Sequence, residues 1–533
     1  MRFSCLTRAC ILADCRRSLV FALERQSRGL AVASGEVEDD RASHPWPLQA
    51  LAAENRAVFN PHRHYFLRTS RGLEQVLEAE LLQLGIDANL QRADGGVTLE
   101  GPDEAFWSAV LQSRLVESAQ LLAGKPFHSP YEATLRNHSR GVAWSDYVWF
   151  GSKPLDLSIK VTTQESRLFH KKMVEEHVTA AIEEQRQKLL KAELQEVEDS
   201  AFYARPDPPP PPKIFVHVQK DECRISIAAL QEPHPRAYMT AAAAAVQNAQ
   251  HGEDVMLAAL QEGFRGGADA GPLGLWSTHA AACIYRSRLL EMIEEADAAG
   301  EELLVWDPFC GSGVLLLELL GILLGIPPAS PELPMPFVNY PCFNSARFKA
   351  LLQTLAINPH PAVRSLSLLG SDSDPGNIEA AQLSLAAFRR VMPRKRFTPL
   401  PDLPCKVAFR RVDDITKLPP ELKGQRLVIL TNAPYGSKSA RGHAARAYRA
   451  LGQVVDWQAK FGKLQAAYCV SARDYFRRGS ALEWRTELRF FNADVHVELL
   501  RWTGQQVETD KQRMPPRNRK REEDRCSDTV SKA

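Results

Sequence analysis

The sequence predicts an α/β protein whose C-terminal half is a Rossmann-like domain with a mostly parallel sheet. Three observations support this. An apolar strand at Leu303–Asp307 runs into a glycine turn, and a helix follows from Val314. A second apolar strand, at Leu427–Leu430, ends in an Asn-Ala-Pro-Tyr turn. Strand and helix patterns alternate along this half, which is typical of a parallel sheet covered by helices on both faces.

The N-terminal half has a different order of elements, which predicts an α+β region. A strand begins at Tyr65, and a helix with leucines at helical spacing and a strand at 95–99 follow it. Further elements are expected as helices at 104–111 and 174–194 and as strands at 155–161, 214–218 and 223–229. The proline run at 206–212 interrupts this region, and we expect it to be an extended loop.

Composition limits the classes of function. The chain has 533 residues, too many for one core, and should form about two to four units. Its net charge of +2 is balanced, so affinity for nucleic acid has to come from local patches. Candidates are His170–Lys172 and the basic positions after the second turn, namely Lys438, Arg441, His443, Arg446 and Arg449. The ten cysteines contain no C-x-x-C pair, and no apolar run is long enough for a membrane span, so we expect neither disulfides, a metal site nor a membrane anchor.

The first turn reads D-P-F-C-G-S-G and has the features of a cofactor site. Its glycines allow close approach of the backbone to a ligand, and the next helix offers unpaired N–H groups to an anion. The dinucleotide pattern G-x-G-x-x-G does not fit, because residue 316 is Leu. An acid at the strand end can accept from an ammonium group, which favours S-adenosylmethionine over NAD, although a lone G-x-G is more often a plain turn. The candidate cofactor residues here are Asp307, Phe309, Gly311, Ser312 and Gly313.

Two later strands also end in acids. Asp372 and Ser373 follow the strand at 366–370, and adjacent parallel strands end at the same crevice, so Asp372 is a candidate for holding ribose hydroxyls. Asp374 is better explained as a helix N-cap before Pro375. Asp414 follows the strand at 407–412 and is a candidate acceptor for an adenine amino group, with a solvated turn as an equal alternative.

The second turn is where we expect chemistry. An amine conjugated to an aromatic ring becomes nucleophilic only as its nitrogen pyramidalises, and oxygen acceptors for its two hydrogens favour that geometry without a strong base. Asn432 offers a side-chain oxygen, and Pro434 restricts Ala433 so that the Ala433 carbonyl is aimed as the second acceptor. Tyr435 offers a ring on which an unstacked base could rest.

These motifs resemble those of class I S-adenosylmethionine-dependent methyltransferases, and more narrowly the THUMP-domain RNA guanine-N2 methyltransferases that modify bacterial large-subunit ribosomal RNA. The family motifs D-P-x-C-G-S-G-T, G-x-D-x-D-P and N-P-P-Y-G correspond to residues 307–314, 370–375 and 432–436. The resemblance implies a seven-stranded sheet, S-adenosylmethionine as cofactor, and ribosomal RNA as partner, with tRNA a further candidate. Val314 replaces the family threonine, and Ala433 replaces the first proline, which loosens the reacting turn.

Other segments extend the resemblance over most of the chain. Gly271–Leu273 with a helix at 278–293 resembles the family's approach to the cofactor fold, and Leu488–Trp502 resembles its final hairpin. Ser166–His170 and Arg224–Leu230 are similar to segments of the THUMP unit. The resemblance therefore implies a ferredoxin-like plus THUMP region that binds RNA and selects the base.

Four regions follow from these patterns. Residues 1–60 are expected to be a disordered extension, and its arginine-rich start resembles a transit peptide for a mitochondrion or plastid. Residues 61–245 form the ferredoxin-like and THUMP region with a proline-rich insertion near 195–213. Residues 265–505 form the methyltransferase domain. Residues 506–533 are a basic, disordered tail that suits a nuclear address or RNA contact, so nucleus and cytoplasm stay open.

The expected activity is transfer of a methyl group to the exocyclic N2 of a guanosine in structured RNA. The same turn chemistry serves adenine N6 in RNA or DNA, which is the first alternative. Ala433 suggests the second, a non-catalytic RNA-binding assembly factor.

Overall fold

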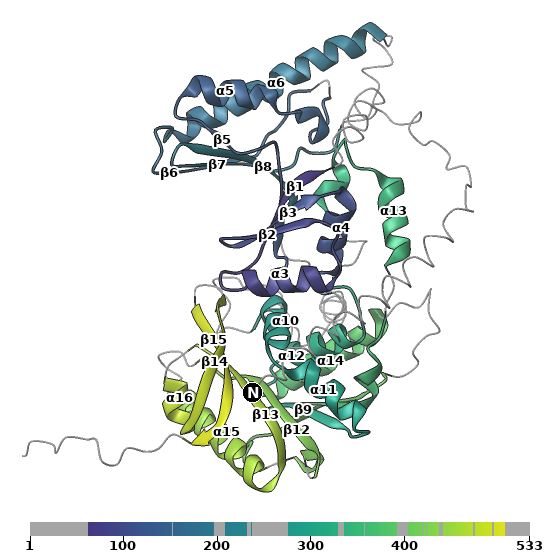
Figure 1. Cartoon of the computed structure of the whole chain (residues 1–533), viewed down its shortest axis with the longest axis vertical. Helices are drawn as coiled ribbons and strands as arrows, with labels where there is room; N and C mark the ends of the chain where they lie inside the picture. Colours follow the sequence, from purple (N-terminus) through teal and green to yellow (C-terminus); the bar gives the residue numbers. More distant parts are fainter. Residues whose placement is uncertain are drawn as a thin grey trace, which may run out of the picture.

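A computed structural model of the chain describes residues 62–151, 153–196, 208–231, 236, 275–328, 335–355, 358–391, 403–417, 419–422, 424–435, 441–472, 475–492 and 495–506. Figure 1 shows these residues as two halves, each built on one sheet, with the N-terminal half above the C-terminal half. The expected transit peptide, the basic tail and Gly271–Leu273 lie outside the described residues.

The N-terminal sheet has eight strands, in the order β2-β3-β1-β4-β8-β7-β6, with β5 paired to β8. Its strands are β1 (Arg63–Arg68), β2 (Asn89–Ala93), β3 (Gly96–Gly101), β4 (Ser118–Leu122), β5 (Phe127–His128), β6 (Ile159–Gln164), β7 (Ile214–Gln219) and β8 (Glu222–Leu230). Its helices are α3 (Glu74–Gln83), α4 (Asp103–Gln112), α5 (Glu132–Gly141), η2 (Trp144–Asp146) and α6 (Lys171–Glu196). The described strands and helices at 63–128 agree with the α+β order expected from the sequence.

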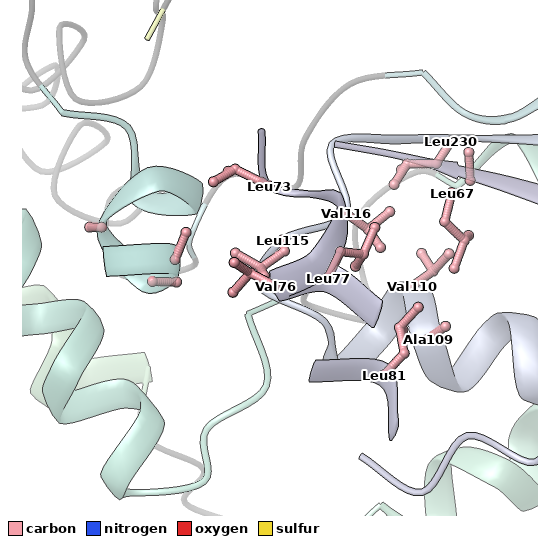
Figure 2. Close-up of a cluster of buried hydrophobic side chains, with 14 of the residues drawn as sticks. Leu67, Leu73, Val76, Leu77, Leu81, Ala109, Val110, Leu115, Val116 and Leu230 are labelled. Atoms are coloured by element: carbon pink, nitrogen blue, oxygen red, sulfur yellow. The ribbon is translucent and has the colours of Figure 1, made fainter. Parts of the chain in front are cut away.

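The first part of this half is a β-α-β-β-α-β unit with the sheet order of a ferredoxin-like fold. Strand β1 alternates, so that Tyr65 and Leu67 point into the core, and α3 buries Val76, Leu77 and Leu81 on one face. Figure 2 shows Leu67 and the side chains of α3 gathered with those of α4 and of the segment between α4 and β4. Burial of this apolar surface is the main force that holds α3 and α4 on the sheet.

The C-terminal sheet has seven strands in the order β11-β10-β9-β12-β13-β15-β14. Strands β9 to β13 are parallel to one another. At one edge, β15 runs antiparallel to both of its neighbours, β13 and β14. The strands are β9 (Leu303–Asp307), β10 (Leu366–Asp372), β11 (Lys406–Arg411), β12 (Arg426–Asn432), β13 (Lys463–Ser471), β14 (Leu482–Asn492) and β15 (Val495–Gln506). This arrangement confirms the Rossmann-like, mostly parallel sheet and the final hairpin.

The C-terminal half also contains helices, and one sequence expectation about them was wrong. The helices are α10 (Ser277–Arg286), α11 (Leu289–Ala298), α12 (Val314–Leu323), η3 (Pro336–Asn339), α13 (Ser345–Thr354), η4 (Pro361–Ser365), α14 (Pro375–Val391), η5 (Pro420–Leu422), α15 (Arg441–Phe461) and α16 (Tyr475–Ser480). The single helix expected at 278–293 is two helices. Ser287 adopts an extended backbone, its hydroxyl donates to the Ile284 carbonyl, and Tyr468 accepts from the Arg288 N–H.

The segment between α12 and β10 joins the two halves. The Trp149 indole donates to the Asn339 carbonyl (2.8 Å), and the Tyr340 hydroxyl donates to the Ala228 carbonyl (2.6 Å). Phe337 packs edge-on against Phe106 of α4. Figure 1 shows α13 beside α4, in agreement with the packing of these helices. The C-terminal sheet is therefore anchored to the N-terminal half by its own insertion.

A buried charge cluster makes a second junction. Glu318 of α12 accepts from Arg114 (2.9 Å) and from Arg236 (2.8 Å), and all three side chains are almost fully buried. Arg114 follows α4, so the pair links the ferredoxin-like unit directly to the helix that leaves the first turn. Because an unpaired buried charge is costly, this cluster strongly favours one orientation of the halves.

Candidate functional site

The two turns expected to form the site lie at the same edge of the C-terminal sheet. Strands β9 and β12 are parallel neighbours, with Val305 opposite Val428 and Trp306 opposite Ile429. Strand order reverses here, because β10 lies on the other side of β9, and ligands of open α/β sheets bind at such a switch point. The Thr431 hydroxyl donates to Asp307 Oδ1 at 2.5 Å, so the ends of the two strands are in direct contact.

Asp307 is a buried carboxyl at the centre of this edge, and only 1% of it is exposed. Burial raises its pKa to about 7, and the charge of Asp372 acts in the same direction. Hydrogen bonds from Thr431 and from the Phe309 N–H (3.1 Å) oppose the rise. A carboxyl in this condition gains most from a cation placed beside it, since the attraction between the opposite charges offsets the desolvation that penalises ionisation.

The glycine turn has the backbone that its sequence predicted. Gly313 has φ +83° and precedes the first residue of α12, and a Cβ at this position would lie 2.7 Å from the Phe409 ring. The Gly311 N–H donates to Asp372 Oδ2 (3.1 Å), and the Cys310 N–H donates to the Ser371 carbonyl (2.9 Å). Hydrogen bonds to the end of β10 therefore fix the backbone of the turn, and the Asp372 carboxylate accepts one of them.

The other predicted cofactor residues lie in different settings. Ser312 is half-buried in the turn, and Phe309 packs on the same core cluster as Ile415. Ser373 is exposed beyond the end of β10. Asp414 is exposed, and its Oδ1 accepts from both the N–H and the hydroxyl of Thr416, which lowers its pKa. The structure thus shows Asp414 closing its own turn, and its contact with an adenine stays a prediction.

The Asn-Ala-Pro-Tyr turn presents one oxygen that the fold does not use. Asn432 Oδ1 is buried, and among the described residues it has no hydrogen-bond partner. The Ala433 N–H donates to the Val470 carbonyl of β13 (3.1 Å), and the Tyr448 hydroxyl of α15 donates to the Pro434 carbonyl (2.5 Å). The backbone of the turn is therefore fixed from two sides, while the amide oxygen of Asn432 stays free for a ligand.

Tyr435 is not placed as a stacking platform. Its side chain is 7% exposed and belongs to the main core cluster, so neither ring face is open to a base in this arrangement. Burial raises the pKa of its hydroxyl, and the Asn492 side chain at the end of β14 opposes the rise. The predicted stacking would require the ring to leave this position, whereas its observed contacts anchor the turn.

Three residues of the site escaped sequence reasoning: Thr431, Tyr448 and Asn492. Thr431 had a signal, because it is a polar side chain in an otherwise apolar strand beside Asn432. The others come from distant segments, and their sequence surroundings carry no sign of this role. Cys310, treated as a packing residue, is buried, and burial raises the pKa of its thiol.

The part of the chain that the structure describes lacks two other features. Across these residues no group of His, Cys, Asp and Glu has the arrangement of a metal site. None of the helices found there is long and apolar enough to cross a membrane.

Known proteins support the interpretation of both halves. Residues 64–117 match the family model of the RlmL ferredoxin-like domain. A candidate RNA methyltransferase from Synechocystis sp. is 23% identical over 397 residues, covering 74% of this chain and 85% of the relative. A candidate methylase from Clostridium difficile 630 superposes with TM-score 0.56 at 19% identity, covering 86% of this chain and 100% of that one. The candidate methyltransferase SMU.472, complexed with SAH, gives TM-score 0.55 at 18% identity, with 84% and 100% covered.

The C-terminal half is thus a methyltransferase fold, with the acid, glycine turn and Asn-x-Pro-Tyr turn at its switch point. Together with the matched N-terminal domain, these findings support an RlmL-like, THUMP-associated methyltransferase.

Proposed function

We propose that this protein transfers a methyl group from S-adenosylmethionine to the exocyclic N2 of a guanosine in structured RNA, with ribosomal RNA as the first candidate. The observation that carries the proposal is the buried, unsatisfied Asn432 Oδ1, one residue from Thr431, which donates to Asp307. A buried acceptor without a partner is costly, so its retention beside a candidate cofactor acid supports a ligand that donates to it.

The residues present fit S-adenosylmethionine. Asp307, with its raised pKa, would accept from the methionine ammonium group, and the N–H groups at the start of α12 would face the carboxylate. A Cβ at Gly311 would meet no atom within 4 Å, so the turn leaves open space on that side. Asp372 and Asp414 remain candidates for the ribose and the adenine. When bound, this cofactor supplies an electrophilic methyl group.

Asn432 would act on the nucleophile. Its Oδ1 would accept one hydrogen of the guanine amine, and the Ala433 carbonyl would accept the other, which favours a pyramidal nitrogen with its lone pair directed at the methyl group. Tyr448 fixes the Pro434 carbonyl and Val470 fixes the Ala433 N–H, so the acceptors are held in place before substrate arrives. This proposal needs no charged base at the turn.

The RNA partner is supported by the name of the Synechocystis relative and by one surface of the N-terminal half. The Arg167 guanidinium lies 5.8 Å from the centre of the exposed Tyr131 ring, and Phe169 is also exposed beside His170. Exposed rings beside cations suit stacking on unpaired bases and contact with phosphates.

The test is Asn432→Ala, with the exposed Asn89→Ala as a matched control. We expect Asn432→Ala to lower kcat by roughly a hundredfold or more, as for loss of one transition-state contact, while the Kd for S-adenosylmethionine measured by calorimetry changes little. Asn89→Ala should behave as the wild type. Equal turnover in Asn432→Ala would remove Asn432 from the mechanism.

The base is identified by mass analysis of nucleosides from RNA incubated with enzyme and labelled cofactor. N2-methylguanosine supports the proposal, and N6-methyladenosine would keep the chemistry but change the substrate. Absence of both cofactor binding and transfer in the wild type would instead favour a non-catalytic RNA-binding factor.

A further inference from the structure

A line of buried polar groups leads from the second turn to the ferredoxin-like unit. The Asn492 side chain faces the Tyr435 hydroxyl and opposes the rise of its pKa, and Asn492 Oδ1 lies 2.9 Å from His279 Nδ1. His279 Nε2 lies 2.9 Å from the Ser70 hydroxyl, which contacts Glu117 at 2.5 Å. The turn, the final hairpin, α10 and the loop after β1 thus contribute one side chain each before the line ends at Glu117.

His279 is held rigidly at the centre of this line. Its side chain is completely buried, and its ring lies against Trp276 (5.4 Å between ring centres) and Phe490 (5.0 Å). Burial lowers its pKa to about 4, so the imidazole is neutral near pH 7. A neutral imidazole has one donor and one acceptor nitrogen, so the role of Nε2 toward Ser70 determines the role of Nδ1 toward Asn492.

The hydrogen-bond roles of the neighbouring groups, Asn492 on one side and Ser70 on the other, depend on His279 in the same way. Asn492 Oδ1 can only accept, so His279 Nδ1 carries the imidazole proton and Nε2 accepts from the Ser70 hydroxyl. The Asn492 NH2 group is then left to face the Tyr435 hydroxyl. Each contact therefore constrains the next, and such a chain of hydrogen bonds is stronger as a unit than as separate pairs.

A second contact places the Ser70 loop firmly on the final hairpin. Gly72 has φ +94°, and a Cβ there would lie 2.1 Å from the Arg489 carbonyl oxygen of β14. The loop backbone therefore approaches β14 as closely as a glycine allows, three residues before Asn492. This contact keeps the distance between Ser70 and Asn492 constant.

We propose that His279 and Asn492 are positioning residues that couple the Ser70 loop of the ferredoxin-like unit to the Asn432–Tyr435 turn. The proposal rests on the proposed function, because the turn is where the target amine would be held. The unit expected to bind RNA would thereby fix the orientation of the turn, which compensates for the proline that Ala433 replaces. Neither residue would touch the substrate.

Ser70→Ala tests the coupling, because Ser70 lies more than 300 positions from the turn in the chain and leaves His279 and Asn492 in place. We expect deuterium exchange of the segment 429–435 to become at least about threefold faster, and kcat to fall roughly three- to tenfold with the KM for RNA unchanged. Asn492→Ala should give larger changes in the same direction. Ser70→Thr, which keeps the hydroxyl, should restore wild-type values.

Ser108→Ala is the matched control, since Ser108 belongs to the same unit and its hydroxyl accepts from Gln112 of its own helix. It should change neither exchange at 429–435 nor kcat. Wild-type exchange of this segment in both Ser70→Ala and Asn492→Ala would overturn the proposal, and if Asn492→Ala does not fold, Ser70→Ala decides alone. Absence of methyl transfer in the wild type would refute the proposed function. The deuterium exchange measurement would still test whether the Ser70 loop is coupled to the turn.

Discussion

Cofactor affinity should depend on pH through Asp307. In the cofactor-free protein the pKa of this buried carboxyl is about 7. An ammonium group beside it stabilises the carboxylate, so binding requires the ionised form and expels the proton when it is present. We therefore expect S-adenosylmethionine to bind more weakly as the pH falls below 7, with proton release on binding.

The magnitude follows from the pKa. At pH 8 the carboxyl is mostly ionised, whereas at pH 6 about one molecule in ten is in the binding form. The Kd should therefore rise about tenfold from pH 8 to pH 6, equivalent to about 1.4 kcal/mol. Close to one proton should be released at pH 6 and almost none at pH 8.

The ionisation of Asp307 should also make the stability of the cofactor-free protein depend on pH, in the direction opposite to cofactor affinity. The folded pKa of about 7 lies above the ordinary value of 3.8, so between these values the folded state holds a proton that the unfolded chain has lost. The free energy of unfolding contributed by Asp307 therefore falls as pH rises from about 4 to about 7 and is level above it. The total change is on the order of 4 kcal/mol.

Calorimetric titrations at pH 6 and pH 8, in buffers with different ionisation enthalpies, measure both the Kd and the protons released. Asp307→Asn keeps the acceptor for Thr431 but cannot ionise, so its affinity should be weak at both pH values and independent of pH. Asp94→Asn is the control, because that exposed acid lies between β2 and β3, outside the proposed cofactor site, and its loss should leave the pH dependence intact. An unchanged wild-type Kd with no proton release at pH 6 would refute this account of Asp307.

Three further predictions follow from single contacts. Thr431→Val removes the hydroxyl that stabilises the ionised Asp307, so the Kd for S-adenosylmethionine at pH 7 should rise roughly three- to tenfold by calorimetry, and an unchanged Kd would contradict this role. Glu318→Gln leaves the buried Arg114 without its counter-charge, so the free energy of unfolding measured by urea denaturation should fall by about 3–5 kcal/mol. A loss below about 1 kcal/mol would show that the cluster is dispensable. Gly313→Ala forces a Cβ onto the Phe409 ring at positive φ and should lower the free energy of unfolding by about 1–3 kcal/mol. A clearly lower Tm would confirm this, and an unchanged Tm would contradict it.

Several features could be predicted because short-range patterns encode them. The run from Leu303 through the glycines to Val314 specifies strand, turn and helix by apolar alternation and backbone freedom, and the structure has these elements. Parallel strands end at one edge of a sheet, so the proximity of the two turns also followed from the sequence, and the contact of Thr431 with Asp307 confirms it. The expected break of the chain into an N-terminal α+β half and a Rossmann-like half rests on the same patterns.

Tertiary structure alone decided how the second turn is held. The sequence placed Tyr435 in the turn, but its burial and its contact with Asn492 depend on the docking of the final hairpin. The division of the helix expected at 278–293 likewise depends on Tyr468, from a strand far along the chain. His279 has no local pattern that marks it, because its partners come from three separate segments. Local periodicity specifies which elements form, whereas the partners of a buried polar group depend on packing between residues hundreds of positions apart.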